Sequence, residues 1–276
     1  MRKALDVVTN ALGYTNHETQ TEHGDVHFVR AKGHGRLPPI VLLHGLGSRG
    51  LDYFPVVRHL RGETRAVIAP DLLGHGRSGT PDVAHDVEAL SSALSHSLAH
   101  ALDEPAVVYG NSLGGLAALR FALDRPDLVR GLYLASPAGA ASTAEELAEL
   151  RDLLAVDSHG SALRFLDAVF HEPAPLRHVL AFGLRHRFGA PTPRAILAEL
   201  DESPAFTPEE LGTIRAPIRL FWGRGERLFP PSHLEFFRAH LPPHTEIEEA
   251  HGFGHAPQLD DARALAQRLL DFARTV

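Results

Sequence analysis

Ser112 stands in a sequence pattern that can make a serine hydroxyl nucleophilic. Residues 110–114 read Gly-Asn-Ser-Leu-Gly, after an apolar, β-branched stretch and before leucines at positions 116, 119 and 123. This pattern predicts a buried strand, a tight turn and a helix. The two glycines leave room for strained backbone angles at the serine, and the turn lifts its hydroxyl off the sheet. The N–H of Leu113, which begins the helix, then faces the place where an attacked carbonyl would develop negative charge.

A serine hydroxyl needs a general base and a third group that orients the base. His255 follows the last predicted strand and precedes the last helix, and Glu226 follows the strand before it. Both are therefore expected at the carboxyl edge of the sheet, where Ser112 also lies and where open α/β sheets keep their sites. The chain order serine, acid, histidine is the one that strand–turn–helix serine hydrolases use. The sequence predicts Ser112 as nucleophile, His255 as base and Glu226 as the orienting acid.

Other histidines offer alternative chemistry. His251 is a rival base, but it ends the last strand, so we prefer His255, which begins the helix region. His96 and His100 have the i, i+4 spacing that can hold zinc. Neither has the adjacent glutamate of a His-Glu-x-x-His motif, and no third ligand is apparent, so we expect solvated histidines and no metal.

The elements that must position these residues form an alternating series. With 276 residues and 44% hydrophobic content, the chain is long enough for one large α/β domain. A hairpin turn is expected at residues 22–26, and a short amphipathic helix at 5–12. Predicted strands lie at 26–31, 40–43, 65–70, 105–109, 128–135, 218–222 and 245–250, and predicted helices at 53–60, 83–102, 232–241 and 257–274, besides the one after Ser112. The alternation predicts a mostly parallel central sheet covered by helices on both faces.

The alternation stops between residues 139 and 211. This segment offers helical stretches at 144–154, 162–170 and 176–184, is interrupted by prolines, and contains no convincing strand. We therefore expect a core domain formed by residues 1–138 and 212–276, with an inserted helical cap at residues 139–211.

Several motifs together make the chain similar to a known superfamily. Residues 44–47 read His-Gly-Leu-Gly, residues 71–78 read Asp-Leu-Leu-Gly-His-Gly-Arg-Ser, and the final histidine stands in Gly-His at 254–255. With the Gly-x-Ser-x-Gly turn, these resemble the oxyanion loop, the D-x-x-G-x-G-x-S loop and the terminal histidine motif of the α/β-hydrolase superfamily, in its capped esterase and lipase-like branch. The likeness covers roughly residues 20–275.

The resemblance implies roles for particular residues. It implies that the backbone N–H groups of Leu46 and Leu113 form an oxyanion hole and that His255 takes the proton of Ser112. We expect His44 to brace this oxyanion loop through its ring nitrogens and not to transfer protons. Most relatives carry aspartate where this chain has Glu226, whose extra methylene requires its loop to lie slightly further back. The family's other position for the acid offers only Ser136 here.

Composition and motifs argue against several classes of partner. The net charge is −7 without runs of like charge, so nothing favours a nucleic acid or an anionic membrane, and the absence of cysteine excludes thiolate chemistry. Residues 45–50 match a dinucleotide fingerprint with Asp71 further on, but their strand does not open the sheet, and an oxyanion loop fits better. No cofactor is expected. No apolar run approaches the roughly 20 residues of a membrane span. Asp6 and Asn10 interrupt a signal-peptide pattern, so we expect a cytoplasmic protein.

The expected function is cofactor-free hydrolysis of a carboxylic ester through an acyl-enzyme on Ser112. An apolar acyl group is expected to lie against cap side chains, although the same side chains could simply pack the cap: Leu150, Leu154, Phe165, Leu166, Phe170, Leu180 and Phe182. Three alternatives stay open. A carbon–carbon bond hydrolase shares Gly-Asn-Ser-x-Gly-Gly, but usually has tryptophan where Ala256 stands. A thioesterase differs only in its leaving group, and a small-ligand receptor could keep the triad with little turnover.

Overall fold

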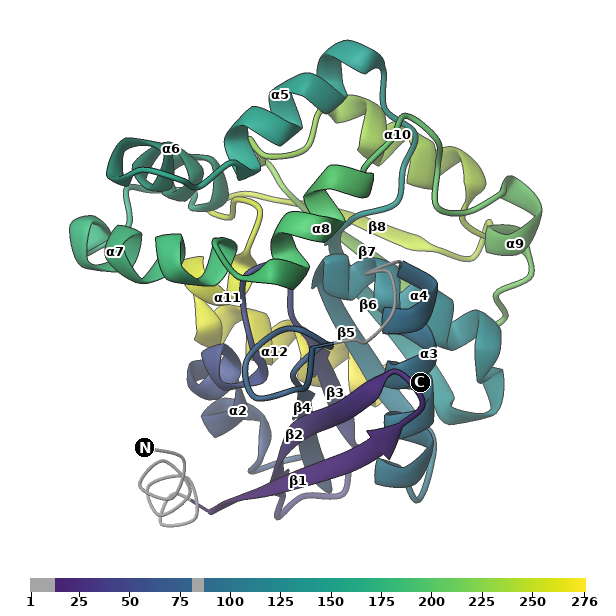
Figure 1. Ribbon diagram of the computed structural model, residues 1–276. Coiled ribbons are helices and arrows are strands. Elements are labelled where there is room, and N and C mark those ends of the chain that lie inside the picture. The colour runs from purple at the N-terminus through teal and green to yellow at the C-terminus, as the bar shows by residue number, and fades with distance from the viewer. Residues whose placement is uncertain (1–12, 81–86) are drawn as a thin grey trace.

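A mostly parallel sheet of eight strands forms the centre of the molecule in the computed structural model, which describes residues 13–80 and 87–276 (Figure 1). In spatial order the strands are β1-β2-β4-β3-β5-β6-β7-β8. Their bounds are β1 Tyr14–Thr21, β2 Gly24–Lys32, β3 Ile40–Leu43, β4 Ala66–Pro70, β5 Ala106–Ser112, β6 Val129–Pro137, β7 Ile218–Gly223 and β8 Glu246–Ala250. The fold class predicted from the sequence is confirmed.

The first two strands are the antiparallel part of the sheet. β1 and β2 pair from Tyr14 opposite Ala31 to Thr21 opposite Gly24, which confirms the predicted hairpin. β2 is also antiparallel to β4, and the remaining neighbours are parallel. The helix expected at residues 5–12 lies outside the described residues.

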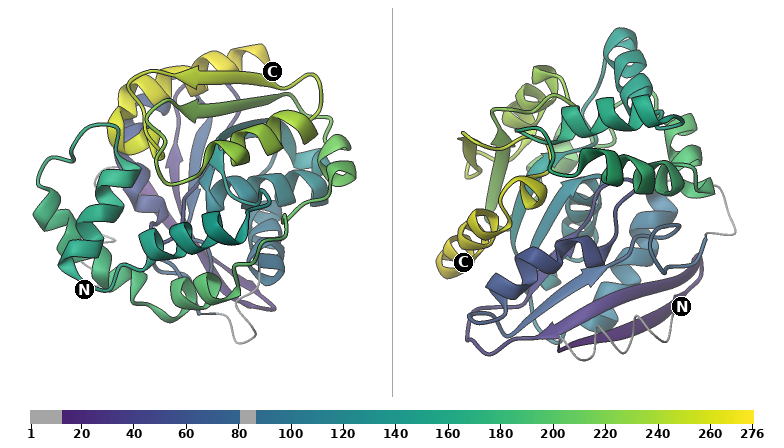
Figure 2. Two further views of the ribbon diagram at one scale, coloured as in Figure 1. Left: turned by 90° about the horizontal axis from the view of Figure 1, so that it is seen from above. Right: turned by 90° about the vertical axis from the view of Figure 1, so that its left-hand side faces the viewer.

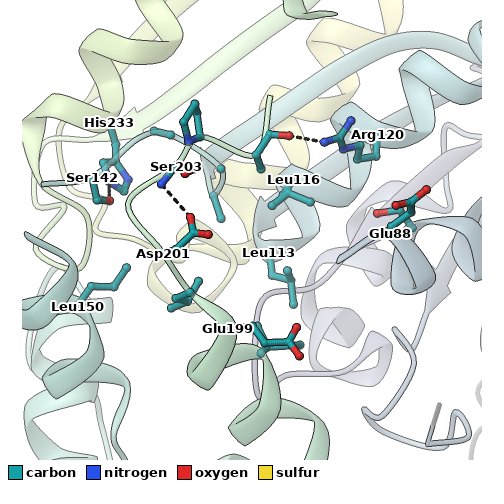
Figure 3. A pocket seen from close by; sticks show the side chains of 18 of the residues that line it. Glu88, Leu113, Leu116, Arg120, Ser142, Leu150, Glu199, Asp201, Ser203 and His233 are labelled. Atoms are coloured by element: carbon teal, nitrogen blue, oxygen red, sulfur yellow. Dashed lines mark hydrogen bonds between the residues drawn. The ribbon is translucent and has the colours of Figure 1, made fainter. Parts of the chain in front are cut away.

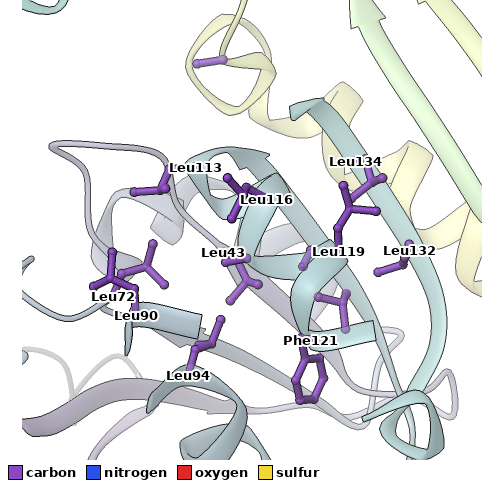
Figure 4. Close-up of a cluster of buried hydrophobic side chains, with 14 of the residues drawn as sticks. Leu43, Leu72, Leu90, Leu94, Leu113, Leu116, Leu119, Phe121, Leu132 and Leu134 are labelled. Atoms are coloured by element: carbon purple, nitrogen blue, oxygen red, sulfur yellow. The ribbon is translucent and has the colours of Figure 1, made fainter. Parts of the chain in front are cut away.

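Helices cover both faces of the sheet, because successive residues of each strand point to opposite sides. In β3, Val41 and Leu43 join a core with α3 Val87–Ala101, α4 Leu113–Asp124 and α10 Pro231–His240. Ile40 and Leu42 join a second core with α2 Phe54–Leu60 and α12 Ala262–Thr275. Figure 4 shows Leu43 with Leu116 and other leucines of the first core beneath the start of α4. Two packed cores therefore hold β5 in the middle of the sheet.

The closing segment corrects one expectation. A single helix was predicted at residues 257–274, but the structure has a short α11, Pro257–Asp260, followed by α12. The break lies at Asp261, whose backbone is extended and whose side chain accepts a hydrogen bond from the N–H of Ala264. Asp261 is therefore the N-cap of α12, and a helix begins anew after it.

Helices fill the segment between β6 and β7. They are α5 Ala144–Leu154, α6 His159–Val169, α7 Arg177–Phe188, α8 Pro191–Glu199 and α9 Pro208–Gly212. Capping boxes at Thr143, Ser158 and Thr207 fix where three of them begin. Most of this segment lies above the sheet in Figure 1, and Figure 2 (left) looks down onto it. Its assignment as a separate cap domain at residues 139–211 stays a prediction. Within the described residues, none of the helices combines the length and apolarity needed to cross a bilayer.

Candidate functional site

Ser112 lies at a sharp turn between β5 and α4. Its backbone angles are φ 57° and ψ −122°, which a non-glycine residue rarely adopts. A Cβ atom at Gly110 would overlap the carbonyl oxygen of Gly114, and one at Gly114 would overlap the carbonyl oxygen of Leu43. The motif needs glycine at both positions because the backbone passes so closely, and this packing holds the serine in its strained conformation.

The loop after β3 runs beside Ser112. A Cβ atom at Gly45 would lie 3.2 Å from the Cβ of Ser112, so the two backbones are in near contact. The ring of His44 is buried; its Nδ1 donates to the carbonyl of Gly45 (2.8 Å), and its Nε2 accepts from the N–H of Leu72 (3.0 Å). Burial lowers the pKa of His44, so the ring is neutral. These bonds confirm that His44 braces the loop.

Two backbone N–H groups near Ser112 have no hydrogen-bond acceptor among the described residues. They belong to Leu46, in the braced loop, and Leu113, at the first turn of α4. Unpaired N–H groups at a helix start favour negative charge nearby. Both N–H groups are thus available to an acceptor, and the oxyanion hole that the family resemblance implies for them stays a prediction.

His255 and Glu226 form a buried hydrogen-bonded pair. The Nδ1 of His255 lies 2.9 Å from the Oε2 of Glu226, and both side chains are only 4% exposed. The other carboxylate oxygen accepts the N–H groups of Leu228 (2.8 Å) and Phe229 (3.0 Å). Burial alone would raise the pKa of Glu226. The His255 ring and these hydrogen bonds lower the pKa by more than burial raises it, so the net pKa is below the usual range. The glutamate is thus ionised at neutral pH and held by three donors.

The second ring nitrogen of His255 is available for chemistry. Its Nε2 is buried and has no hydrogen-bond partner among the described residues. His255 and Ser112 line the same cavity, into which the side chain of Glu226 does not extend. The direct hydrogen bond between Nε2 and the Ser112 hydroxyl is absent from the contacts of the described residues. Serine, histidine and glutamate nevertheless meet at one edge of the sheet, in the chain order expected from the sequence.

The cavity measures about 350 Å³ and is mainly apolar. Of the side chains expected to contact an acyl group, Leu154, Phe165, Leu166, Phe170 and Leu180 line it. Leu150 instead lines a different cavity, and Phe182 is 79% exposed on the outer side of α7. The expectation for these two residues is therefore wrong. Phe182 comes two positions after the cavity-lining Leu180, which places it on the opposite side of α7. Leu150 lies one turn before Leu154 on α5 and lines the neighbouring cavity.

Comparison with known proteins agrees with this architecture. A family model described as "Alpha/beta hydrolase family" matches residues 40–268. The chain belongs to the alpha/beta hydrolase family. A pimeloyl-(acyl-carrier protein) methyl ester esterase of Stenotrophomonas maltophilia is 32% identical over 252 residues, which are 86% of this hydrolase and 93% of the relative.

Two solved structures show the same fold. The naproxen esterase (carboxylesterase NP) of Bacillus subtilis superimposes with a TM-score of 0.74 at 22% identity, over 94% of this hydrolase and 91% of that chain. A 2-hydroxy-6-oxo-6-phenylhexa-2,4-dienoate hydrolase of a Rhodococcus strain has a TM-score of 0.81 at 23% identity. The match covers 95% of this hydrolase and 99% of that chain. At this identity the likeness shows the fold alone. Because the two proteins are named for different reactions, the shared fold does not decide which reaction this chain catalyses.

A network that sequence reasoning missed joins the histidine loop to the serine turn. The side-chain Nδ2 of Asn111 donates to the carbonyls of His255 (2.8 Å) and Ala135 (3.0 Å). Its Oδ1 accepts from Gln258 (2.9 Å), whose own oxygen accepts the hydroxyl of Tyr109. Asn111 stands inside the serine motif, but a motif shows nothing of a partner 144 residues away.

The end of α6 holds the same histidine loop from the other side. The N–H of His255 donates to the carbonyl of Val169 (3.0 Å). The carboxylate of Asp260 accepts the N–H groups of Gly254 (2.7 Å) and His171 (2.8 Å), and burial raises its pKa. The loop that carries the histidine is therefore bonded to the helical segment as well as to the sheet.

The Asp71 loop is a structural brace. Asp71 is buried and accepts hydrogen bonds from the N–H of Gly50 (2.7 Å), the N–H of Arg77 (2.9 Å) and the ring of His27 (2.9 Å). Burial raises its pKa, but these donors hold the net value below the usual range. A carboxylate bound by three internal donors is not free to bind a ribose, which removes support for a dinucleotide site.

The predicted rival residues lie apart from the cavity. His251 is exposed at the end of β8. His96 and His100 lie on α3 with ring centroids 4.5 Å apart, and His100 bonds to the carbonyl of His96. In residues 13–80 and 87–276, no three histidine, aspartate or glutamate side chains are grouped so that they could hold a metal ion.

A second cavity of about 800 Å³ lies under α8 and is more polar (Figure 3). Leu113 and Phe229 line it, and the Phe229 ring packs edge-on against the ring of His255 at 4.8 Å between centroids. Glu88, Glu199 and Asp201 supply acidic groups. This second cavity is thus lined by the residue that follows Ser112 and by a ring that contacts His255.

Proposed function

We propose that this hydrolase cleaves small-molecule carboxylic esters with an apolar acyl group, through an acyl-enzyme on Ser112. The observation that carries the proposal is the His255–Glu226 pair, whose unoccupied Nε2 belongs to a ring lining the same apolar cavity as the strained serine. The curated esterase relative supports ester chemistry. We further propose that residues 139–211 act as a cap over this cavity, because α5, α6 and α7 contribute most of its apolar lining.

The proposed first half of the reaction transfers the acyl group to the enzyme. The Nε2 of His255 takes the proton of Ser112 as the serine oxygen attacks the ester carbonyl carbon. The N–H groups of Leu46 and Leu113 stabilise the resulting oxyanion, and Glu226 stabilises the imidazolium. Collapse breaks the bond to the alkoxy oxygen, which leaves as the alcohol with the proton from His255.

The second half returns the free enzyme. His255 takes a proton from water as the water oxygen attacks the acyl carbon. The bond to the Ser112 oxygen then breaks, the serine regains the proton, and a carboxylic acid leaves. In both halves the charged groups are the imidazolium of His255, the oxyanion and the carboxylate of Glu226. Residues of this chain therefore stabilise every charge that the proposed reaction creates.

Covalent labelling and kinetics test the proposal. A fluorophosphonate should label one serine per chain, and peptide mapping should place the label on Ser112. Ser112→Ala should lose the label and reduce kcat for p-nitrophenyl esters by about 10⁵-fold or more, whereas Ser92→Ala, a surface replacement on α3, should change neither. Label on another residue of the folded protein would contradict the proposal.

The same substrates separate the alternatives. Sustained turnover of p-nitrophenyl esters of graded chain length favours an esterase, and a single slow burst favours a receptor. Matched oxygen and sulfur esters compare esterase with thioesterase activity directly. A dienoate substrate cleaved faster than every ester would favour the carbon–carbon bond hydrolase.

A further inference from the structure

Large apolar side chains gather on the outer side of α7. Among the described residues, six large hydrophobic side chains are at least 37% exposed, and four of them belong to α7 or its N-cap: Leu176, Val179, Leu180 and Phe182. Leu176, Val179 and Phe182 follow one another at intervals of three residues and are 77%, 68% and 79% exposed. This spacing places them on one stripe of the helix. We call these three side chains the α7 stripe.

The stripe continues into the cavity beside Ser112. Val179 and Leu180 are exposed and also line the cavity, together with Gly183 and Leu184 from the same helix. Leu259 of α11 is likewise 44% exposed and lines the cavity. Exposed apolar side chains of α7 and α11 are therefore continuous with the lining of the cavity. α7 lies at the outer edge of the molecule, away from the sheet (Figures 1 and 2).

Positive charge accompanies the stripe. The twelve residues of α7 include three arginines and two histidines and no acid, although the whole chain has a net charge of −7. Arg177 pairs with Asp167, and Arg187 pairs with Asp52. Arg185 is exposed, and in the described part of the chain it bonds only to the carbonyl of Asp157. Its charge therefore remains available beside the stripe.

The apolar stripe and the exposed arginine beside it together favour one kind of binding partner. A helix with an apolar outer stripe and cationic flanks binds the boundary between lipid headgroups and acyl chains, and anionic headgroups strengthen the attraction. A second copy packed on the same stripe would present its own α7, which has no acid to pair with Arg185, and it would cover the cavity mouth. Charge complementarity thus favours an anionic lipid surface over a second copy of the chain.

We propose that α7 docks this protein on anionic lipid surfaces, with Leu176, Val179 and Phe182 inserted among the lipids and Arg185 near the headgroups. Docking would bring the cavity mouth against the lipid, so that an apolar ester could pass from the lipid phase toward Ser112 without crossing water. The docking itself is independent of catalysis. Composition averaged over the whole chain hides this local surface, because acids elsewhere outnumber the cations of α7.

Vesicle flotation with the Ser112→Ala protein tests docking without hydrolysis. Vesicles of equal parts phosphatidylcholine and phosphatidylglycerol should bind the protein more tightly than pure phosphatidylcholine. Leu176→Ser and Phe182→Ser should each weaken binding on the order of tenfold, because each removes a large apolar side chain that would insert into the lipid. Arg185→Gln should weaken it about fivefold on the anionic vesicles alone. Ile247→Ser on β8, which replaces a 37% exposed isoleucine, is the matched control and should leave binding unchanged.

Two further measurements make the proposal decisive. Leu176 and Phe182 do not line the cavity, so their serine variants should hydrolyse a short water-soluble ester at the wild-type rate. Absence of vesicle binding by the folded protein, or equal binding by the Leu176→Ser/Phe182→Ser variant, would overturn the proposal. A wild-type dimer that Phe182→Ser dissociates in sedimentation would overturn it in favour of a second copy. None of these outcomes depends on whether Ser112 is a nucleophile.

Discussion

The side-chain amide of Asn111 donates a hydrogen bond to the main-chain carbonyl of His255, 2.8 Å away. The residue immediately before the proposed nucleophile thereby holds the loop that carries the proposed base. Because its second hydrogen bond goes to the end of β6, Asn111 joins three separate segments of the edge of the sheet. The position of the histidine relative to the serine depends on this buried amide.

Asn111→Ala should therefore reduce both stability and turnover. Two buried carbonyls would lose their donor, so we expect the free energy of unfolding to fall by about 2 kcal/mol. We expect kcat to fall on the order of 100-fold with little change in KM, because the change misplaces the base and leaves the acyl cavity intact. Urea unfolding and steady-state kinetics measure the two effects.

Tyr109→Phe provides the matched comparison. It removes only the hydroxyl at the far end of the same network, where Gln258 keeps its bond to Asn111. We expect kcat within about threefold of wild type. Equal kinetic losses in the two variants would show that general packing, and not the position of His255, causes the effect.

Glu226→Gln should act through the tautomer of His255. The glutamine oxygen can keep the N–H groups of Leu228 and Phe229, which leaves its NH₂ facing the Nδ1 of His255. Nδ1 would then have to accept a hydrogen bond, so the proton would move to Nε2, which could no longer take the proton of Ser112. We expect kcat to fall about 10³-fold, somewhat less than after removal of the serine or histidine.

The control for this variant is Glu249→Gln, at an exposed glutamate that pairs with Arg238. This variant should keep kcat within about twofold of the wild-type value. If Glu226→Gln were as active as this control, Glu226 would not be the orienting acid, and Ser136 at the end of β6 would be the next position to test.

Local sequence patterns predict the serine turn, the hairpin and most strands, because each depends on neighbouring residues. The predicted bounds of β3 and α5 match those in the structure. An unbroken apolar run marks β3, and a capping box marks the start of α5, so both signals lie within the element or next to it. The break at Asp261 was not foreseen, although an aspartate N-cap is a recognisable signal. The links from His255 to Asn111 and Val169 could not be read from the sequence at all, because they join side chains and carbonyls far apart in the chain.

His75 should make stability depend on pH. Burial lowers the pKa of its imidazole to about 3, whereas an unfolded histidine titrates near 6.5. Between these values the unfolded chain binds a proton that the folded chain does not, so folding is destabilised as pH falls below about 6.5. The expected slope is up to about 1.4 kcal/mol per pH unit from this residue. Buried His44, whose pKa is also lowered, adds in the same direction.

Urea unfolding between pH 7 and pH 5 checks this slope. In His75→Asn the side-chain NH₂ can replace the Nδ1–H that bonds to the carbonyl of Leu73. Its stability should fall less steeply with acid than that of the wild type. The same replacement at exposed His100 should leave the wild-type slope, and identical slopes in all three proteins would contradict the prediction.

Asp52 and Arg187 join the loop beside Ser112 to α7. Their nearest atoms lie 2.6 Å apart, a second bond measures 3.2 Å, and the hydroxyl of Ser48 also donates to Asp52. Burial raises the pKa of Asp52, but the arginine and serine hydrogen bonds lower it to a net value below the usual range. The stabilisation from Asp52 is thus present above about pH 4, its unfolded pKa, and is lost as pH falls through the lower folded value.

Arg187→Met should destabilise the fold and loosen the cavity wall. It removes the closer of the two arginines that pair with this partly buried carboxylate and leaves Arg49, whose Nε lies 3.4 Å from Asp52. We therefore expect a loss of about 1 to 2 kcal/mol at pH 7, between the values for surface and buried pairs. KM for apolar esters should rise more than kcat falls, because α7 lines the cavity but carries no group of the proposed triad. The Asp52→Asn/Arg187→Met double variant should recover part of the lost stability. Strict additivity of the two single changes would show that the pair is not coupled, since each side chain would then act alone.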